Sequence, residues 1–196
     1  NRANLWRRIG RDQEALDDYN RAIELEPNDA DYYVARGSVY ADRNQLNDAL
    51  RDLDHALSLV ANHIVAHGNR GNVLELMDRL DDAIQEYNKV IELDPQDYRA
   101  FLNRGYVFFK RGMYDEALQD YSAVIAIRPT EAKGHANRGM VQLKRRHLHK
   151  APTDFDEALR LSPKDSEYLV RRSQIKSSLS DLSGALEDVN LSIKLN

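Results

Sequence analysis

The sequence predicts an all-α fold, an α-solenoid of antiparallel helix–turn–helix repeats, and three observations lead to this prediction. The chain resembles itself when it is shifted by 34 residues. Each 34-residue unit contains two stretches whose apolar residues have the three-and-four spacing of one helix face. In the best-defined unit, a glycine ends the first stretch and a proline ends the second. A chain of 196 residues has room for about six such units.

The period is clearest in columns of residues that lie 34 positions apart. One column is alanine in all six units, a second is glycine or another small residue, and a third is mostly proline. Agreement of this kind does not arise by chance in a chain of this composition, so the repeat is genuine. The columns are Ala15, Ala49, Ala83, Ala117, Ala151 and Ala185; Ala3, Gly37, Gly71, Gly105, Gly139 and Ser173; and Pro27, Ala61, Pro95, Pro129 and Pro163.

The fourth unit shows why each of its two helices begins and ends where it does. Residues 98 to about 111 have an apolar helix face, and Gly112 ends that helix. Asp115 and Glu116 open the second helix, because negative residues in a first turn interact favourably with the helix dipole. Pro129 ends it, since the residue before a proline avoids the α conformation. The first helix presents Phe101, Leu102, Gly105, Phe108 and Phe109, and the second presents Leu118, Tyr121, Ile125 and Ile127.

The six units cover residues 1–29, 30–63, 64–97, 98–131, 132–165 and 166–196. The first unit is incomplete, because residue 1 falls inside its first helix. The sixth ends with its second helix, where Leu186, Val189 and Ile193 would form a bare stacking face. We therefore expect one repeat array, residues 1–196, that is a fragment of a longer protein or a segment whose terminal repeats associate with a second copy.

The fifth unit departs most from the others, in the stretch KRRHLHKAP at residues 144–152. Pro152 lies where the second helix is expected, so we predict a late start or a kink in that helix. His147 and His149 are two residues apart, but two ligands without a third do not make a metal site. A solvated basic turn and a contact for a phosphate or an acidic partner are the two interpretations of this stretch.

The 34-residue columns of small residues, aromatic residues and prolines resemble those of the tetratricopeptide repeat. That repeat is a 34-residue helix–turn–helix unit with small, aromatic and proline positions in a fixed order. The resemblance covers the whole chain. It implies a right-handed superhelix whose first helices line a concave wall, and a scaffold that binds protein or peptide partners. The matching residues are Phe101, Gly105, Phe108, Tyr114, Ala117, Tyr121, Val124 and Pro129 in the fourth unit and Tyr33, Gly37, Tyr40, Leu46, Ala49, Leu53 and Ala56 in the second.

The composition argues against several classes of function. The 28 basic and 32 acidic residues give a net charge of −4, without the concentrated basic surface that nucleic acid requires. The absence of cysteine excludes disulfides, thiol catalysis and thiolate metal sites. No apolar run approaches the roughly 20 residues that span a bilayer, and no signal peptide is visible. We expect neither a nucleic-acid nor a membrane partner, and a cytoplasmic location is the default expectation.

An arginine column and an acidic column recur in all six units. A catalytic site needs one constellation of residues, whereas a repeated pair suits a repeated structural contact. We predict that each arginine pairs with the acid of the preceding second helix, for example Arg104 with Glu86 and Arg138 with Asp120. The columns are Arg2, Arg36, Arg70, Arg104, Arg138 and Arg172, and Asp18, Asp52, Glu86, Asp120, Asp154 and Asp188.

An asparagine column has a different explanation. Asn69, Asn103 and Asn137 each precede the arginine, at a place that points into the groove in superhelical members of the family. Asparagine is a poor residue for a helix interior, so packing does not require it. Its amide carries donors and acceptors, as an extended peptide backbone does. We interpret the column as a peptide-binding ladder, and a solvated helix surface is the alternative.

Helical spacing places other residues on the same inward face. Amides, two aromatic rings and several bases there would suit an extended segment with apolar anchors and some negative charge, although neighbouring helices could instead shield Tyr106 and Phe109. The predicted groove residues are Asn69, Asn72, Arg99, Asn103, Tyr106, Phe109, Lys110, Lys133, Asn137 and Met140.

The family's carboxylate clamp, which grips the C-terminal tail of heat-shock chaperones, fits this chain poorly. Asn72, Asn103 and Lys133 match three of its positions. Gly68 and Asn137 stand where the clamp needs a lysine and an arginine. Two of three basic groups are therefore missing, and we do not predict this ligand.

The sequence thus predicts a protein-interaction scaffold that binds an extended peptide in its groove. No catalytic triad, phosphate-binding loop or paired-carboxylate site stands out, so we expect neither enzymatic activity nor a cofactor. Two alternatives remain. The array could be a self-association module that forms a homo-oligomer through its terminal repeats, or it could recruit substrates for a larger enzyme.

Overall fold

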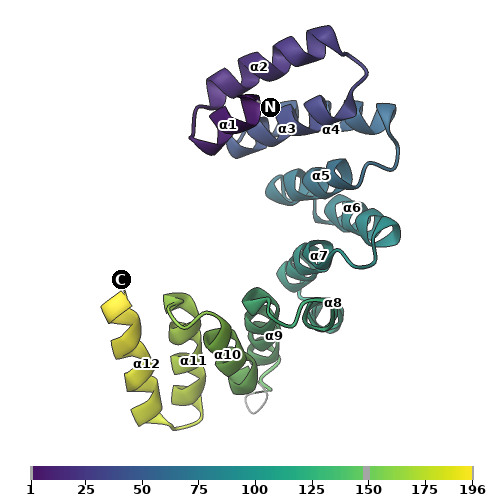
Figure 1. Cartoon of the computed structure of the whole chain (residues 1–196). Coiled ribbons are helices and arrows are strands. Elements are labelled where there is room, and N and C mark those ends of the chain that lie inside the picture. The colour runs from purple at the N-terminus through teal and green to yellow at the C-terminus, as the bar shows by residue number, and fades with distance from the viewer. Residues whose placement is uncertain (1, 148–150, 196) are drawn as a thin grey trace. The chain divides into compact units, whose positions relative to one another are not determined.

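The structure is a computed structural model that describes residues 2–147 and 151–195. Within these ranges all regular secondary structure is helical, and consecutive helices form hairpins (Figure 1). The predicted all-α solenoid of helix–turn–helix repeats is confirmed. The helices are α1 (Arg2–Arg8), α2 (Asp12–Leu25), α3 (Ala30–Asp42), α4 (Leu46–Leu59), α5 (Ile64–Leu76), α6 (Leu80–Leu93), α7 (Tyr98–Lys110), α8 (Tyr114–Ile127), α9 (Ala132–Lys144), α10 (Ala151–Leu161), α11 (Ser166–Ser178) and α12 (Leu182–Leu195).

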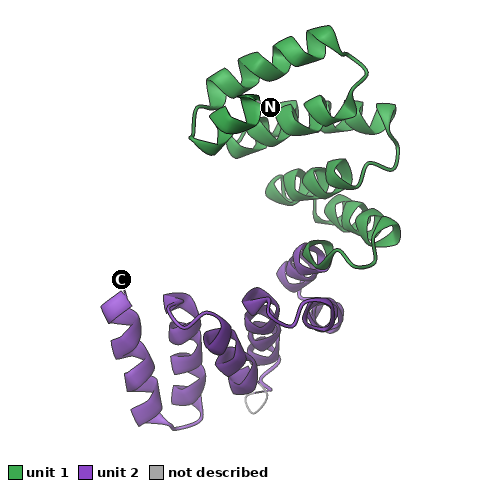
Figure 2. Cartoon of the chain, in the orientation of Figure 1, with its two compact units in different colours: residues 1–100 green, residues 101–196 purple. Residues whose placement is uncertain are grey.

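The chain divides into two compact units, residues 1–100 and 101–196 (Figure 2). Unit 1 holds α1 to α6 and the first residues of α7, and unit 2 holds the rest of α7 and α8 to α12. Helices α3, α5, α7, α9 and α11 begin at the first residues of the repeats predicted above. A single array over residues 1–196 and its superhelical hand stay predictions.

The second helix of a pair ends just before the proline column. Helix α2 ends at Leu25, and Glu26, with φ −134° and ψ 72°, has left the helical conformation, as the residue before a proline must. Val60, after α4, adopts φ −135° and ψ 92° although Ala61 replaces the proline. The ends of these helices are therefore set by the packing of the repeat as well as by proline.

The turn inside each hairpin contains one residue with a left-handed backbone. Gly10 and Gly112 have φ of 74° and 73°, a conformation that glycine adopts without strain. Other residues at the same position have φ between 58° and 67°, so the turn keeps one geometry in every pair. They are Asn44, Asp78, Arg146 and Ser180.

The glycine column makes room for the aromatic residue of the paired helix. A Cβ atom on Gly71 would lie 2.7 Å from Cε1 of Tyr87, and one on Gly139 would lie 2.8 Å from Cε2 of Phe155. Tyr87 and Phe155 are fully buried. Glycine is required here because a methyl group would overlap the ring.

The arginine column pairs with the acid of its own hairpin, 16 residues further along the chain, so the predicted pairing with the preceding second helix is wrong. Arg104 donates from Nε and Nη2 to Asp120, at 2.9 and 2.6 Å, and Arg138 binds Asp154 through two nitrogens. The reason is local. The arginine precedes the glycine and the acid precedes the aromatic residue, so the close glycine–aromatic contact brings the two side chains together.

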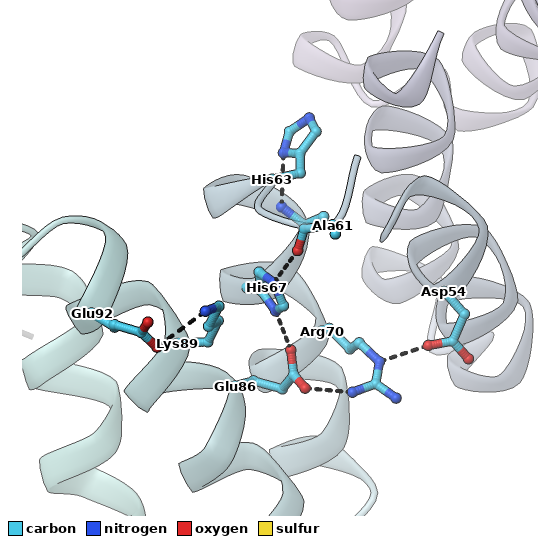
Figure 3. A network of polar contacts seen from close by, with 9 residues as sticks. Asp54, Ala61, His63, His67, Arg70, Glu86, Lys89 and Glu92 are labelled. Atoms are coloured by element: carbon cyan, nitrogen blue, oxygen red, sulfur yellow. Dashed lines mark hydrogen bonds and ion pairs between the residues drawn. The ribbon is translucent and has the colours of Figure 1, made fainter. Parts of the chain in front are cut away.

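The preceding helix supplies a second partner in some units. Arg70 donates from Nη1 to Glu86 at 2.5 Å and from Nε to Asp54 of α4 at 2.6 Å (Figure 3). His67 bridges Glu86 and the carbonyl of Ala61, at 2.7 and 3.0 Å. This network (Figure 3) ties the end of α4 and the following turn to α5 and α6.

Helix α10 as described begins at Ala151, with Pro152 in its first turn, where proline is tolerated. The predicted late start or kink concerns residues 148–150, which lie outside the described residues, as does His149 of the predicted basic turn.

Candidate functional site

Four positions on each first helix recur with spacings of four, three and four residues, so they lie along one helix face. On α5 they are Val65, Asn69, Asn72 and Leu76. We call these positions the amide stripe, and all the predicted groove residues except Phe109 fall on it. The corresponding residues are Asp31, Ala35, Ser38 and Asp42 on α3, Arg99, Asn103, Tyr106 and Lys110 on α7, and Lys133, Asn137, Met140 and Lys144 on α9.

In unit 1 the stripe borders a pocket of about 200 Å³. We call it the Asn69 pocket. Its apolar wall mixes with hydroxyl, amide and charged groups, and its residues come from α1, α3, α4 and α5. The lining residues are Arg7, Gly37, Ser38, Ala41, Asp42, Leu53, Asn69, Asn72, Val73 and Leu76.

The two asparagines of this pocket are held in place by hydrogen bonds. Asn69 Nδ2 donates to Ser38 Oγ on the neighbouring helix α3 at 2.9 Å. The side-chain carbonyl oxygen of Asn69, Oδ1, has no hydrogen-bond partner among the described residues. Asn72 Oδ1 accepts from the hydroxyl of Tyr87 at 2.8 Å. Burial raises the pKa of Tyr87, which keeps this hydroxyl protonated as the donor.

The apolar ends of the stripe on α5 were not among the residues predicted from the sequence. The exposed fractions of Val65 and Leu76 are 56% and 59%, which is high for large apolar side chains on an otherwise packed helix. They flank the two asparagines. Extending the spacing of three and four by one step in each direction from Asn69 and Asn72 would have found them. Arg7 and Asp42 form an ion pair at the pocket, with 2.8 Å between Nη2 and Oδ2. No spacing pattern in the sequence indicates this pair.

Two of the predicted groove residues, Arg99 and Phe109, make local contacts. Arg99, at the start of α7 in unit 1, is exposed and donates to Asp97 at 3.3 Å. Phe109, in unit 2, is half-buried, and its ring centroid lies 5.9 Å from that of Tyr114. It packs against the core around Tyr121 and so lies off the stripe.

The α7 residues that lie on the stripe in unit 2 are partly open to solvent. Asn103 is half-buried, and Tyr106 and Lys110 are exposed. Lys110 Nζ lies 6.0 Å from the centroid of the Tyr106 ring, within the range of a cation–π contact.

The α9 residues of the stripe combine a base, an amide and a thioether. Lys133 is exposed and Asn137 is half-buried. Met140 is half-buried and packs against the core around Phe155. Among the residues that the structure describes, Lys133 and Asn137 have no side-chain hydrogen-bond or ion-pair partner.

The stacking face predicted on α12 is exposed. The exposed fractions of Leu186 and Ile193 are 60% and 68%, whereas Ile84 and Leu159, which occupy the same positions in other units, are 8% and 7% exposed. A shallow depression between α11 and α12 is lined by Leu182, Leu186 and Val189 together with four polar residues of α11.

Neither a metal-ligand cluster nor a membrane-spanning helix is present in residues 2–147 and 151–195. No group of three or more histidine, aspartate or glutamate side chains there is arranged to hold a metal ion. Within the same ranges, no helix has the length and apolar character needed to cross a membrane.

Sequence comparison identifies the family. The profile described as TPR repeat matches residues 3–42 and 71–112, and the tetratricopeptide repeat profile matches residues 98–131. Together they span about half of the chain. The chain is a tetratricopeptide repeat protein. Proteins of this family commonly act as scaffolds that mediate protein–protein interactions. No curated protein matches the sequence.

Solved structures agree with the tetratricopeptide repeat fold. PilW, described as a widely conserved type IV pilus biogenesis factor, is 18% identical with a TM-score of 0.87, over 95% of this chain and 86% of PilW. A tetratricopeptide repeat protein from Parabacteroides merdae is 17% identical with a TM-score of 0.83, over 100% and 77%. YrrB, described as a TPR protein with an unusual peptide-binding site, is 20% identical with a TM-score of 0.71, over 91% and 92%. At these identities the likeness concerns the fold alone.

Proposed function

We propose that this tetratricopeptide repeat chain is an interaction scaffold that binds an extended peptide segment along its amide stripe. The observation that carries the proposal is the Asn69 pocket, where a concave site borders a carboxamide with an available carbonyl oxygen. An extended backbone offers N–H donors to that oxygen, because it has no internal hydrogen bonds to satisfy them.

The pocket also suits a peptide side chain. Ala41, Leu53, Val73 and Leu76 contribute its apolar wall, and its volume of about 200 Å³ is enough for one aliphatic side chain. The exposed Val65 and Leu76 extend this apolar surface on each side of the asparagines. A peptide with an apolar residue in the pocket and its backbone beside Asn69 would use both features.

The site needs little reorganisation before it binds. Ser38 orients the amide of Asn69, and Tyr87 orients that of Asn72. Because the scaffold side chains are already ordered, mainly the peptide loses conformational entropy on binding. This preorganisation favours affinity. The unusual peptide-binding site of YrrB adds circumstantial support.

The test compares two triple variants. Asn69, Asn103 and Asn137 are replaced by alanine in the first, and the exposed Asn47, Asn62 and Asn190 are replaced by alanine in the control. The probe is a peptide selected from a random 12-residue display library on the wild-type chain, and its affinity is measured by fluorescence anisotropy.

Loss of the amide hydrogen bonds should weaken binding by about ten- to hundredfold in the first variant. Its free energy of unfolding should stay within about 1 kcal/mol of wild type, and the control should bind normally. Equal affinity of the two variants would contradict the proposal.

The exposed apolar face of α12 favours self-association as a second candidate function. Apolar patches of this kind mark interaction sites in soluble proteins. Sedimentation velocity across a hundredfold dilution series should show an assembly that dissociates and that the Leu186→Glu variant abolishes. A monomer at all concentrations would rule this candidate out.

A further inference from the structure

His67 occupies a place at which the first helix of a repeat is joined to the turn before it. Its Nε2 lies 3.0 Å from the carbonyl oxygen of Ala61. Tyr33, 34 residues earlier in the chain, donates from its hydroxyl to the carbonyl of Pro27, also at 3.0 Å. A carbonyl oxygen only accepts, so Nε2 of His67 carries a proton and is the donor. This first contact is structural and does not by itself require a charged ring.

The other ring nitrogen of His67 makes a contact that its counterpart in unit 2 lacks. His67 Nδ1 lies 2.7 Å from Oε2 of Glu86 on α6 (Figure 3). His135, in the same column, also has its Nε2 beside a turn carbonyl, at 3.1 Å, but its Nδ1 lies 3.9 Å from Oδ1 of Asp154. A hydrogen bond does not form at 3.9 Å. Glu86 is the only glutamate in the acid column, and its extra methylene group brings the carboxylate within reach of the ring.

The two contacts of His67 need one proton more than a neutral imidazole and an ionised carboxylate hold. One proton lies on Nε2, and a second lies between Nδ1 and Oε2 of Glu86, on one atom or the other. Neutral His67 beside ionised Glu86 has a single ring proton, which can satisfy Glu86 or the carbonyl of Ala61 but not both. The side chains of His67 and Glu86 are only 12% and 13% exposed, so water screens their contact little. The contact therefore depends on a proton that belongs to the pair.

The charged groups around this pair form further ion pairs. Arg70 of α5 donates from Nη1 to Oε1 of Glu86 at 2.5 Å and from Nε to Asp54 of α4 at 2.6 Å. Lys89 of α6, one turn after Glu86, binds Glu92 at 3.1 Å. Arginine, lysine and ion-paired carboxylates keep their charge near neutral pH, so the proton shared with the histidine is the part of this network that responds to pH there.

His63, one turn before His67, does not need a second proton. Its Nε2 lies 2.9 Å from Oδ1 of Asp31 on α3, and its Nδ1 accepts from the backbone N–H of Ala66 at 3.3 Å. A neutral ring that carries its proton on Nε2 makes both contacts. The two histidines at the start of α5 therefore differ in the number of protons that their contacts require.

We propose that the His67–Glu86 contact is a pH-sensitive switch, which joins α5 to α6 while the pair holds its shared proton and opens when that proton is lost. In the unfolded chain the two groups are apart, and a histidine loses its proton at about pH 6.5. The folded contact retains the proton, so its contribution to stability is complete below that pH and is lost as pH rises above it. The switch does not depend on peptide binding, although α5 also carries Asn69.

The test uses substitutions that other repeats of the chain already contain. His67→Tyr keeps a donor for the turn carbonyl, as Tyr33 provides, but removes the ring that titrates. Glu86→Asp shortens the acid by one methylene group, to the residue found in the rest of its column. His135→Tyr is the matched control, because it removes the histidine whose second nitrogen has no hydrogen bond to the acid column.

Urea unfolding of the four chains at pH 5.5 and pH 8 provides the first measurement. Over this range the unfolding equilibrium constant of the wild type and of His135→Tyr should rise about tenfold more than that of His67→Tyr or Glu86→Asp. If His67→Tyr rises as much as the wild type, the inference is overturned.

Native-state hydrogen exchange of the wild type gives a local measurement that needs no variant. The protection factors of amides in α5, divided by those of the corresponding amides in α9, should fall about tenfold between pH 6 and pH 8. The protection factor already corrects for the intrinsic effect of pH on exchange. A ratio that does not change with pH would equally overturn the inference.

Discussion

In unit 1, Gly71 faces Tyr87 and Arg36 binds Asp52, and in unit 2, Gly139 faces Phe155 and Arg138 binds Asp154. These packing contacts recur with the same register and nearly the same distances. The amide stripe does not recur in this way, because on α3 and α5 it is apolar or charge-paired, and on α7 and α9 it is basic. The comparison separates columns that hold the hairpins together from stripe positions whose residues differ between the units.

The largest expected effect tests whether the packing columns are equivalent in the two units. Asp52→Ala in unit 1 and Asp154→Ala in unit 2 each leave a mostly buried arginine without its bidentate partner. Each should lower the free energy of unfolding by about 3 kcal/mol. Urea unfolding followed by circular dichroism provides the measurement.

The controls are Asp48→Ala and Glu157→Ala, which remove surface partners of Arg51 and Arg160 on the same helices. Each should cost no more than about 1 kcal/mol. A large loss in one unit and almost none in the other would show that the packing columns are not equivalent.

A smaller effect is expected at two glycines of α5. Gly71→Ala places a methyl group 2.7 Å from the Tyr87 ring and should destabilise the chain by about 1–3 kcal/mol. Gly68→Ala meets only Val90 at 4.0 Å and should stabilise the helix by up to about 1 kcal/mol. Thermal unfolding of the two variants should therefore shift in opposite directions, and a shift in the same direction would contradict the packing account.

The smallest effect concerns two acids of the same column in unit 2. Burial alone raises the pKa of Asp188, but hydrogen bonds and charge from Arg172 and Lys176 outweigh it and leave the pKa below its ordinary value. Burial raises the pKa of Asp120 above its ordinary value, because Arg104 offsets only part of the burial.

The two carboxylates therefore respond oppositely to acid. The stabilisation from Asp188 is present above the ordinary aspartate pKa, about 3.9, and is lost as pH falls through its lower folded pKa. Asp120 takes up its proton more readily in the folded state, so its ionisation penalty is relieved as pH falls through its raised pKa.

Urea unfolding between pH 6 and pH 2.5 can separate them. Asp188→Asn should reduce the loss of stability in acid, and Asp120→Asn should increase it. If both variants changed the loss of stability in acid in the same direction, the extra interaction of Lys176 with Asp188 would not distinguish the Arg172–Asp188 pair from the Arg104–Asp120 pair.

Much of the fold could be predicted because the 34-residue columns record which residues pack at each level. The arginine–acid pairing could not, since one arginine faces an acid of its own hairpin and can also reach the preceding helix, as Arg70 does with Glu86 and Asp54. Only the glycine–aromatic contact decides whether the arginine binds the acid of its own hairpin or an acid of the preceding helix.

Most of the predicted groove positions share one helix face for a similar reason. Helical spacing identified the face that holds Asn69 and Asn137, but it did not reveal that Phe109 packs against Tyr114. It also did not reveal the pocket, because Ser38 and Asn69 come from different repeats and only the fold brings them together.

We propose that the asparagine column contacts the ligand while the packing columns maintain the fold. The most direct measurement follows the side-chain amide resonances in a ¹H–¹⁵N spectrum while the display-selected peptide is added. The signals of Asn69 and Asn137 should shift, and those of Asn47 and Asn62 should not. Shifts at Asn47 and Asn62, with Asn69 and Asn137 unchanged, would contradict it.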